Sequence, residues 1–267
     1  MLPVPQTIAR IPILRGVYRV VLSGYAYLTR GRYMVEERMG LRLLLDQVNA
    51  VDRQIFIGGT WEKELVDTLF ALVEEQRRLH DREAVFLDLG AHWGLYALLA
   101  HKRGLFKRIV AFEPDPTNYA QLQANLFLNR AENVIEVRRL AVSDREQTFG
   151  LYVTTQANRG ATRLVEQMPD GRPTCRSVRA DRELDFEGKL LVAKIDVEGH
   201  EMEAIEGMAG LLAKNRCVVQ LEIWSTPEEE MEIRLAKLEK LFARYGIKRV
   251  RSIIADHFFV SDPDART

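Results

Sequence analysis

A glycine turn after a short apolar run contains the first residues that could do chemistry. The run from Val85 to Leu89 is apolar apart from Asp88, and Gly90 and Gly94 follow before an apolar helical pattern begins at Leu95. This order predicts a buried strand, a turn and a helix. Glycine lets the backbone of such a turn approach a ligand closely, and the helix start behind it has unpaired N–H groups.

Asp88 distinguishes this turn from a dinucleotide-binding turn, whose first glycine lets backbone meet a pyrophosphate. Here a carboxylate ends the strand instead. It would repel a pyrophosphate by a few kcal/mol at an effective dielectric constant of about 20. The same charge attracts a ligand that carries ammonium or sulfonium groups, and S-adenosylmethionine carries both without a phosphate. The alternative is a structural turn with a capping aspartate.

Other polar residues follow the next strands, and ligands of open α/β sheets bind beyond the carboxyl ends of the strands. Glu113 ends a strand at 108–112, at the spacing where nucleotide-binding folds place an acidic residue on the ribose hydroxyls. A carboxylate accepts two such hydrogen bonds at once. Residues 141–144 follow the third strand, where an adenine edge would lie, or Ser143 and Asp144 form an ordinary turn.

A second dense cluster follows the predicted strand at 190–195. Asp196 and Glu198 alternate there, and Gly199 turns the chain into a helix. Two carboxylates beside a cationic methyl donor can hold a substrate hydroxyl and accept its proton. Hard cations bind carboxylates, so a metal site is possible in principle, but two ligands are too few to predict one. His200 is either a base or a solvated helix cap, and Glu222 ends the fifth strand as a supporting residue or a substrate acceptor.

The elements that position these residues alternate between strand and helix, which predicts a mostly parallel sheet. Strands are predicted at 84–87, 108–112, 134–137, 190–195 and 217–223, helices at 93–103, 117–129, 201–213 and 227–245, and a closing antiparallel pair at 247–254 and 257–260. An insert adds short strands at 149–153 and 177–179. The polar segment 156–174 between them is predicted to be a mobile loop over the strand ends.

The region before this pattern is predicted to be a separate extension, residues 1–80, with the main domain at 81–267. Residues 1–32 have a helical apolar stripe among arginines, which indicates a packed helix, a lid, a dimer arm or a surface helix near anionic lipid. Short strands are predicted at 41–45 and 54–57. A helix is predicted from Trp61 to Leu79 with Thr60 as its N-cap.

Composition limits the classes of partner. The 267 residues have a formal net charge of zero, which argues against nucleic-acid binding over a broad surface. Two distant cysteines indicate neither a disulfide framework nor a metal site. Arg15 and Arg19 interrupt the apolar segment 11–28, so no membrane span is predicted, and a cytoplasmic location is expected.

The motifs together resemble a known family. They are Asp88-Leu-Gly90-Ala-His-Trp-Gly94, Ala111-Phe-Glu113-Pro-Asp-Pro116, Ala141-Val-Ser143-Asp144 and Lys194-Ile-Asp196-Val-Glu198-Gly-His-Glu201, in that order. This set resembles the FkbM family of S-adenosylmethionine-dependent methyltransferases over residues 83–224. The resemblance implies a class I methyltransferase (Rossmann-like) fold with a seven-stranded, mostly parallel sheet and helices on both faces. It also implies methyl transfer, typically to a hydroxyl of a sugar, glycan or natural product.

The resemblance also implies roles for individual residues. The implied donor-binding turn consists of Asp88, Gly90, Ala91, His92 and Gly94. Glu113 is implied to bind the ribose, and the adenine-side wall is implied to be Ala141, Val142 and Ser143. The implied acceptor-facing catalytic residues are Lys194, Asp196 and Glu198. The family usually has asparagine at the position of His92, so contacts to the amino-acid end of the donor differ here.

Two other functions stay open on the sequence alone. A nicotinamide-dependent oxidoreductase would use a similar fold, although the missing first glycine disfavours it. A catalytically inactive donor-binding or scaffold protein would keep the same motifs. The sequence names neither the small-molecule or carbohydrate acceptor nor the base, and a homo-oligomer formed through the N-terminal extension is possible.

Overall fold

The computed structural model describes residues 31–155, 157–166, 173–224 and 228–262, together with positions 21, 24, 28 and 29. The chain divides into two compact units, residues 1–61 with 155–160 and residues 62–154 with 161–267. This division differs from the boundary expected at residue 80. Helix α4 (Lys63–His80) belongs to the second unit because it packs on β10 (Leu190–Ile195) and β11 (Arg216–Glu222) of that unit's sheet.

The first unit contains a hairpin and a helix. Strands β1 (Tyr33–Arg38) and β2 (Leu41–Asp46) pair antiparallel, and α3 (Ala50–Gly58) follows. The strand predicted at 54–57 is therefore wrong, and β1 was not predicted. The Asn49 side chain starts α3 by accepting from Val51 N at 2.9 Å, and Ile55 and Phe56 are buried on one helix face. The predicted helix within residues 1–32 lies largely outside the described residues.

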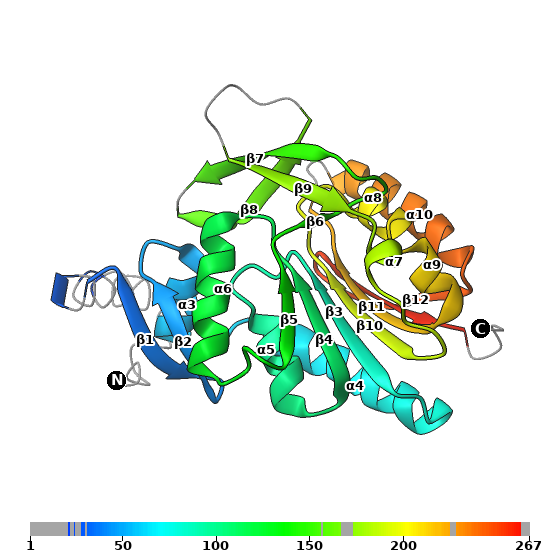
Figure 1. Cartoon of the computed structure of the whole chain (residues 1–267), viewed down its shortest axis with the longest axis horizontal. Coiled ribbons are helices and arrows are strands. Elements are labelled where there is room, and N and C mark those ends of the chain that lie inside the picture. Colours follow the sequence, from blue (N-terminus) through cyan, green and yellow to red (C-terminus); the bar gives the residue numbers. More distant parts are fainter. Residues whose placement is uncertain are drawn as a thin grey trace. The chain divides into compact units, whose positions relative to one another are not determined.

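The second unit is built on a seven-stranded sheet with the order β12-β13-β11-β10-β3-β4-β5 (Figure 1). Its strands are β3 (Ala84–Leu89), β4 (Phe106–Phe112), β5 (Ile135–Arg138), β10 (Leu190–Ile195), β11 (Arg216–Glu222), β12 (Ile247–Ile253) and β13 (Asp256–Ser261). The first five of these in chain order are parallel, and β13 is antiparallel to both of its neighbours. The predicted fold class is thereby confirmed. The strand order reverses between β3 and β10, which is where such sheets bind ligands.

Alternating side chains of the buried strands face two helical layers. Phe86 of β3 stacks on Phe70 of α4, with ring centroids 6.4 Å apart, and α5 (Leu95–Arg103) lies on the same face. Leu87 and Leu89 face the opposite way, into the core formed with α8 (Glu201–Glu206), α9 (Ala209–Lys214) and α10 (Glu228–Ala243). Helix α6 (Pro116–Leu128) joins β4 to β5 and begins after the side-chain cap Asp115.

Two helix predictions need correction. The single helix predicted at 201–213 is divided into α8 and α9 at Gly207, where the backbone passes so close to Ser143 that a Cβ would lie 2.1 Å from the Ser143 carbonyl oxygen. The predicted N-cap Thr60 is also wrong. Helix α4 begins after Glu62, whose φ of 47° is left-handed and whose side chain makes no capping hydrogen bond.

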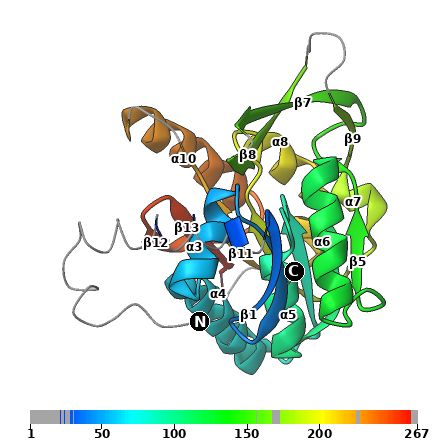
Figure 2. The ribbon, with the colours of Figure 1, turned by 90° about the vertical axis from the view of Figure 1, so that its left-hand side faces the viewer.

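A second sheet, with the order β6-β9-β7-β8, follows β5 in the chain. Its strands are β6 (Ala141–Val142), β7 (Thr148–Thr155), β8 (Asn158–Val165) and β9 (Thr174–Val178), and the short helix α7 (Ala180–Glu183) follows. The loop predicted at 156–174 is thus wrong for 158–165, which form a strand, while 167–172 lie outside the described residues. Strands β7, β8 and β9 lie together at one end of the main sheet in both views (Figures 1 and 2).

Among the described residues, the helices are all too short or too polar to cross a membrane.

Candidate active site

The glycine turn after β3 directs its backbone amides into the protein. The N–H groups of Gly90 and Ala91 both donate to the carbonyl oxygen of Phe112 at 3.0 Å, and Gly94 N donates to Ala91 O at 2.8 Å. A turn built to hold a pyrophosphate presents its amides to the ligand. These three amides are already used, so the turn is poorly suited to that role.

Gly90 brings the turn into contact with the segment that follows β10. Its φ is 78°, and a Cβ there would lie 1.8 Å from the carbonyl oxygen of Asp196. Asp196 N also donates to Leu89 O at 3.0 Å. Gly94, with φ of 91°, is less crowded, because its nearest neighbour would be Leu122 Cγ at 3.1 Å. Glycine at position 90 therefore joins two of the predicted site segments directly.

Asp88 lies beneath the turn. It is 2% exposed, and its Oδ2 accepts from the N–H of Ala97 in the first turn of α5 at 3.0 Å. Burial raises the pKa of Asp88 to about 7, against the opposing effects of the Ala97 N–H and the Lys194 charge. The sequence placed this carboxylate at an open strand tip facing a ligand. In the structure it instead links β3 to α5 and supports the turn from below.

Glu113 and His92 meet at the end of β4. Glu113 Oε2 accepts from His92 N at 2.7 Å, and its Oε1 accepts from Asp115 N at 2.8 Å. Burial raises the pKa of Glu113 to about 8, although these amides act to lower it. Oε1 also accepts from Asn118 Nδ2 at 3.4 Å, so the second lone pair of Oε2 is the one that can accept a hydroxyl group. The left-handed backbone of His92, with φ of 52°, aims its amide at Glu113, a contact that the motif spacing did not indicate.

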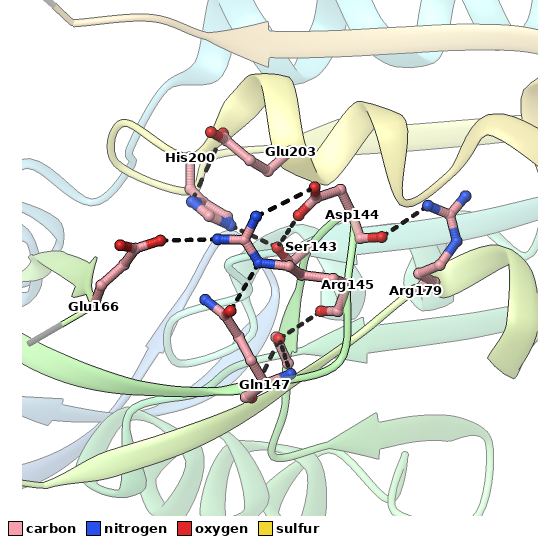
Figure 3. Close-up of polar contacts among 9 residues, drawn as sticks. Ser143, Asp144, Arg145, Gln147, Glu166, Arg179, His200 and Glu203 are labelled. Carbon is pink, nitrogen blue, oxygen red and sulfur yellow. Dashed lines mark hydrogen bonds and ion pairs between the residues drawn. The ribbon is translucent and has the colours of Figure 1, made fainter.

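The predicted adenine-side residues lie in the second sheet. Ala141 and Val142 are buried in β6, and Ser143 N donates to Val178 O of β9 at 2.9 Å. The hydroxyl oxygen of Ser143 lies 2.9 Å from Nε2 of His200 (Figure 3). The structure therefore connects this segment to the turn that carries Glu198, rather than leaving it as an isolated loop.

His200 continues this contact toward α8. Its Nδ1 lies 3.7 Å from Glu203 Oε2, as Figure 3 shows, and its ring meets Phe149 edge-on at 5.2 Å. Burial lowers the pKa of the His200 imidazole. Ser143, His200 and Glu203 contact one another in that order, as in a catalytic triad. Ser143 is completely buried, however, so its hydroxyl cannot act as a nucleophile on a substrate.

Lys194 carries a buried positive charge that three carboxylates share. Its Nζ lies 3.1 Å from Glu222 Oε2, 3.4 Å from Asp256 Oδ1 and 3.7 Å from Asp196 Oδ2. Burial acts to lower the pKa of Lys194, but the carboxylates raise it well above its ordinary value, so it stays charged. Asp256 was missed from the sequence, because only the antiparallel register of β13 places it opposite Glu222.

The carboxylates of this cluster do not ionise equally. Burial, with Glu222 and Glu198 nearby, raises the pKa of Asp196 well above its ordinary value, against the pull of Lys194. Burial also acts to raise the pKa of Glu222, but Lys194 and hydrogen bonds hold it below its ordinary value. Burial and Glu222 raise the pKa of Glu198 to about 7. The Asp196 carboxyl therefore binds a proton more readily than the Glu222 carboxyl, and Glu198 changes its ionisation near neutral pH.

These side chains border a cavity of about 730 Å³. Asp196, Glu198 and Glu222 line one part of it, and Arg163 of β8 lies among the other lining residues. Trp224, which is 57% exposed, also lines the cavity, and its indole N–H donates to Glu222 Oε1. The cavity thus combines carboxylates, an exposed cation and an exposed aromatic face.

The described residues contain no group of three or more His, Cys, Asp or Glu side chains arranged to hold a metal ion.

Comparison with known proteins adds a family match. The model of the Methyltransferase FkbM domain matches residues 88–258, more than half of the chain. The chain is 30% identical over 206 residues to the AMB antimetabolite synthetase AmbE of Pseudomonas aeruginosa, covering 62% of this chain and 10% of that protein. It is 26% identical over 167 residues to the hexuronic acid methyltransferase AglP of Haloferax volcanii, covering 61% of this chain and 64% of that protein.

The chain spans less than two thirds of the length of both relatives. Among solved structures, the methyltransferase FkbM from Methylobacillus flagellatus has 14% identity and a TM-score of 0.47, covering 93% of this chain and 59% of that one.

Proposed function

The chain belongs to the FkbM methyltransferase family, and from its site we propose that it transfers a methyl group from S-adenosylmethionine to a hydroxyl oxygen. The observation that carries this proposal is the inward-facing glycine turn beside a buried carboxylate. The amides of Gly90 and Ala91 are used by Phe112, so they favour a ligand without a diphosphate. The Glu113 carboxylate supplies oxygen acceptors for ribose hydroxyls.

The residues present fit this donor. Glu113 would bind the ribose, Ala141, Val142 and Ser143 would border the adenine, and residues 90–94 would contact the amino-acid end. Asp88 would contribute from beneath, by holding α5 against the turn through Ala97. When bound, S-adenosylmethionine supplies a methyl group on a positively charged sulfur atom.

Glu198 is the general base in this proposal. Its pKa of about 7 matches proton transfer near neutral pH. As the acceptor oxygen bonds to the methyl carbon and the carbon–sulfur bond breaks, the hydroxyl proton passes to Glu198. Asp196, which lines the same cavity, would hydrogen-bond the acceptor and orient it, and Lys194 keeps the Glu222 carboxylate in place. Most of the acceleration comes from alignment.

The cavity supports a hydroxylated acceptor such as a sugar, a glycan or a natural product. An exposed indole face, such as that of Trp224, packs against the C–H face of a sugar ring, while carboxylates accept its hydroxyls. The relative from Haloferax volcanii is named for a hexuronic acid, which makes uronic acids and neutral sugars the first acceptors to test. Assembly through the N-terminal extension, residues 1–80, the absence of nucleic-acid partners and a cytoplasmic location stay predictions.

Calorimetry and a transfer assay test the proposal together. S-adenosylmethionine and NAD are titrated separately into the protein, and the protein is then incubated with methyl-labelled donor and a panel of neutral sugars, uronic acids and polyols. We expect binding of S-adenosylmethionine alone and an O-methyl product identified by NMR. Binding of NAD instead would favour the oxidoreductase, while donor binding without product across a broad panel would favour an inactive scaffold.

A further inference from the structure

Two carboxylates of the cavity come from different segments, and one arginine contacts both segments. Glu198 lies on the turn after β10, and Glu222 ends β11. Arg234 projects from α10 and also lines the cavity. Because both carboxylates must face one acceptor, the distance between their segments matters to the proposed reaction.

The first contact of Arg234 is with the turn that carries Glu198. Nη2 of Arg234 is paired with Oε2 of Glu201, whose side chain is only 3% exposed. Glu201 Oε1 in turn accepts from Gly199 N at 2.6 Å. Glu198 and Gly199 have φ values of 51° and 103°, and a non-glycine residue in this region is strained. The Glu201 carboxylate, fixed by Arg234, holds this strained turn in place.

The second contact is with the segment after β11. Nη1 of Arg234 donates to Trp224 O at 3.1 Å. The indole N–H of Trp224 donates to Glu222 Oε1, and Lys194 contacts Glu222 Oε2 at 3.1 Å. Trp224 and Lys194 therefore hold the two oxygens of the Glu222 carboxylate, and Arg234 fixes the backbone of Trp224.

We propose that Arg234 is a positioning residue that sets the placement of Glu198 relative to Glu222 across the acceptor cavity. The proposal rests on the proposed function only in treating these carboxylates as parts of a methyl-transfer site. A guanidinium is required, because its rigid fork presents donors in two directions at once, whereas a lysine ammonium is a point charge on a flexible stem.

Loss of this contact has a predicted effect on titration as well as on geometry. Glu198 is faced by the carboxyl groups of Glu222, Glu201 and Asp196, and by Arg163 and Lys194, which carry positive charge. Burial and the repulsion from Glu222 keep its pKa at about 7. If the turn is released, Glu198 moves toward solvent and away from Glu222. The pH at which activity reaches half its maximum then falls.

The test compares R234Q and R234K with the control R249Q. Arg249 also forms an ion pair with α10, through Glu239 at 2.6 Å, but on the exposed side that faces β12. Hydrogen exchange of the Gly199 amide reports the turn without any need for activity. We expect R234Q to speed this exchange about tenfold or more, corresponding to about 1.4 kcal/mol of lost protection, and R249Q to leave it unchanged.

Kinetics separate positioning from general stability. R234Q is expected to lower kcat about tenfold or more and shift its acidic limb to lower pH, with donor Kd within about twofold of the unaltered protein. R234K is expected to have a kcat between those of R234Q and the unaltered protein. If R234Q does not fold, R234K is the variant used for the test. Unchanged Gly199 exchange and an unchanged pH profile in both variants would overturn the proposal. If the unaltered protein methylates no acceptor, the proposed function fails while the exchange data still decide the role of Arg234.

Discussion

The α-carbon of Gly90 lies against the carbonyl oxygen of Asp196, with room for a hydrogen atom but not for a methyl group. A Cβ at this position would lie 1.8 Å from that oxygen. The Asp196 N–H is meanwhile bonded to Leu89 O at 3.0 Å. The turn proposed to bind the donor and the segment proposed to bind the acceptor are thus in direct backbone contact, so a change in either moves the other.

We expect G90A to be far more damaging than G104A. Both glycines have left-handed φ values, 78° and 64°, but a Cβ at Gly104 meets nothing within 4 Å. The backbone penalty of about 1 kcal/mol is common to both variants, whereas G90A must also displace Asp196. Urea unfolding should give a loss of about 1 kcal/mol for G104A and about 3 kcal/mol or more for G90A. Equal losses would contradict the close approach.

Replacing the buried carboxylate of Glu113 should weaken donor binding. Glutamine has one acceptor oxygen, so E113Q cannot accept from His92 N, Asp115 N and ribose hydroxyls together. We expect the Kd for S-adenosylmethionine to rise about tenfold or more, which is about 1.4 kcal/mol. The control E136Q alters a carboxylate of β5 that pairs with Arg108, and calorimetry should find its donor affinity unchanged. Full affinity in E113Q would remove the ribose assignment.

Asp88 should make stability depend on pH. Its folded pKa of about 7 lies above the ordinary 3.8, so the folded protein binds more protons than the unfolded chain between about pH 4 and 7. The free energy of unfolding therefore falls as pH rises through this window, by up to about 4 kcal/mol from this residue. D88N keeps an oxygen for Ala97 N and removes the ionisation. Urea unfolding at pH 5 and pH 8 should give a smaller decline in D88N, and parallel pH curves would refute this.

Glu198 should control the pH dependence of the reaction. Because its carboxylate must be ionised to accept a proton, kcat should rise with pH through about 7 and then level off. E198Q is expected to lower kcat by about 10² to 10⁴ without changing donor affinity. E132Q, at an exposed position after α6, serves as the control. If E198Q keeps the kcat and pH profile of the unaltered protein, Glu198 is not the base, and Asp196 becomes the next candidate.

The sequence pattern predicts well the buried strands of the main sheet and the turns that directly follow them. The apolar runs of β3, β4 and β10 are buried on both faces, so their ends, and with them Gly90, Glu113 and Asp196, could be located from sequence. Residues 54–57 misled the same reasoning, because a short apolar run does not distinguish a strand from a buried helix face.

Long-range pairing explains what could not be predicted. Asp256 reaches Lys194 only because β13 runs antiparallel beside β11, and Arg234 reaches Glu201 across 33 positions of sequence. The sequence located Asp88 correctly at the end of β3 but did not indicate that it is buried. Only the packing of α5 shows that its carboxylate accepts from Ala97 N. None of these contacts leaves a periodic signal in the sequence.

The shared charge of Lys194 has a consequence for turnover. Lys194 supplies one positive charge to the carboxyl groups of Asp196, Glu222 and Asp256, and the pKa of Asp196 is raised well above its ordinary value. Under the proposed function, the positive charge of a bound sulfonium should lower the pKa of Asp196 and favour release of a proton, whereas the spent thioether, which is uncharged at sulfur, should not. The enthalpy of binding should then vary with the ionisation heat of the buffer for the fresh donor only. Such a pocket would bind the charged donor in preference to the uncharged thioether that the reaction leaves behind. A binding enthalpy that does not depend on the buffer would show that charge makes no such distinction.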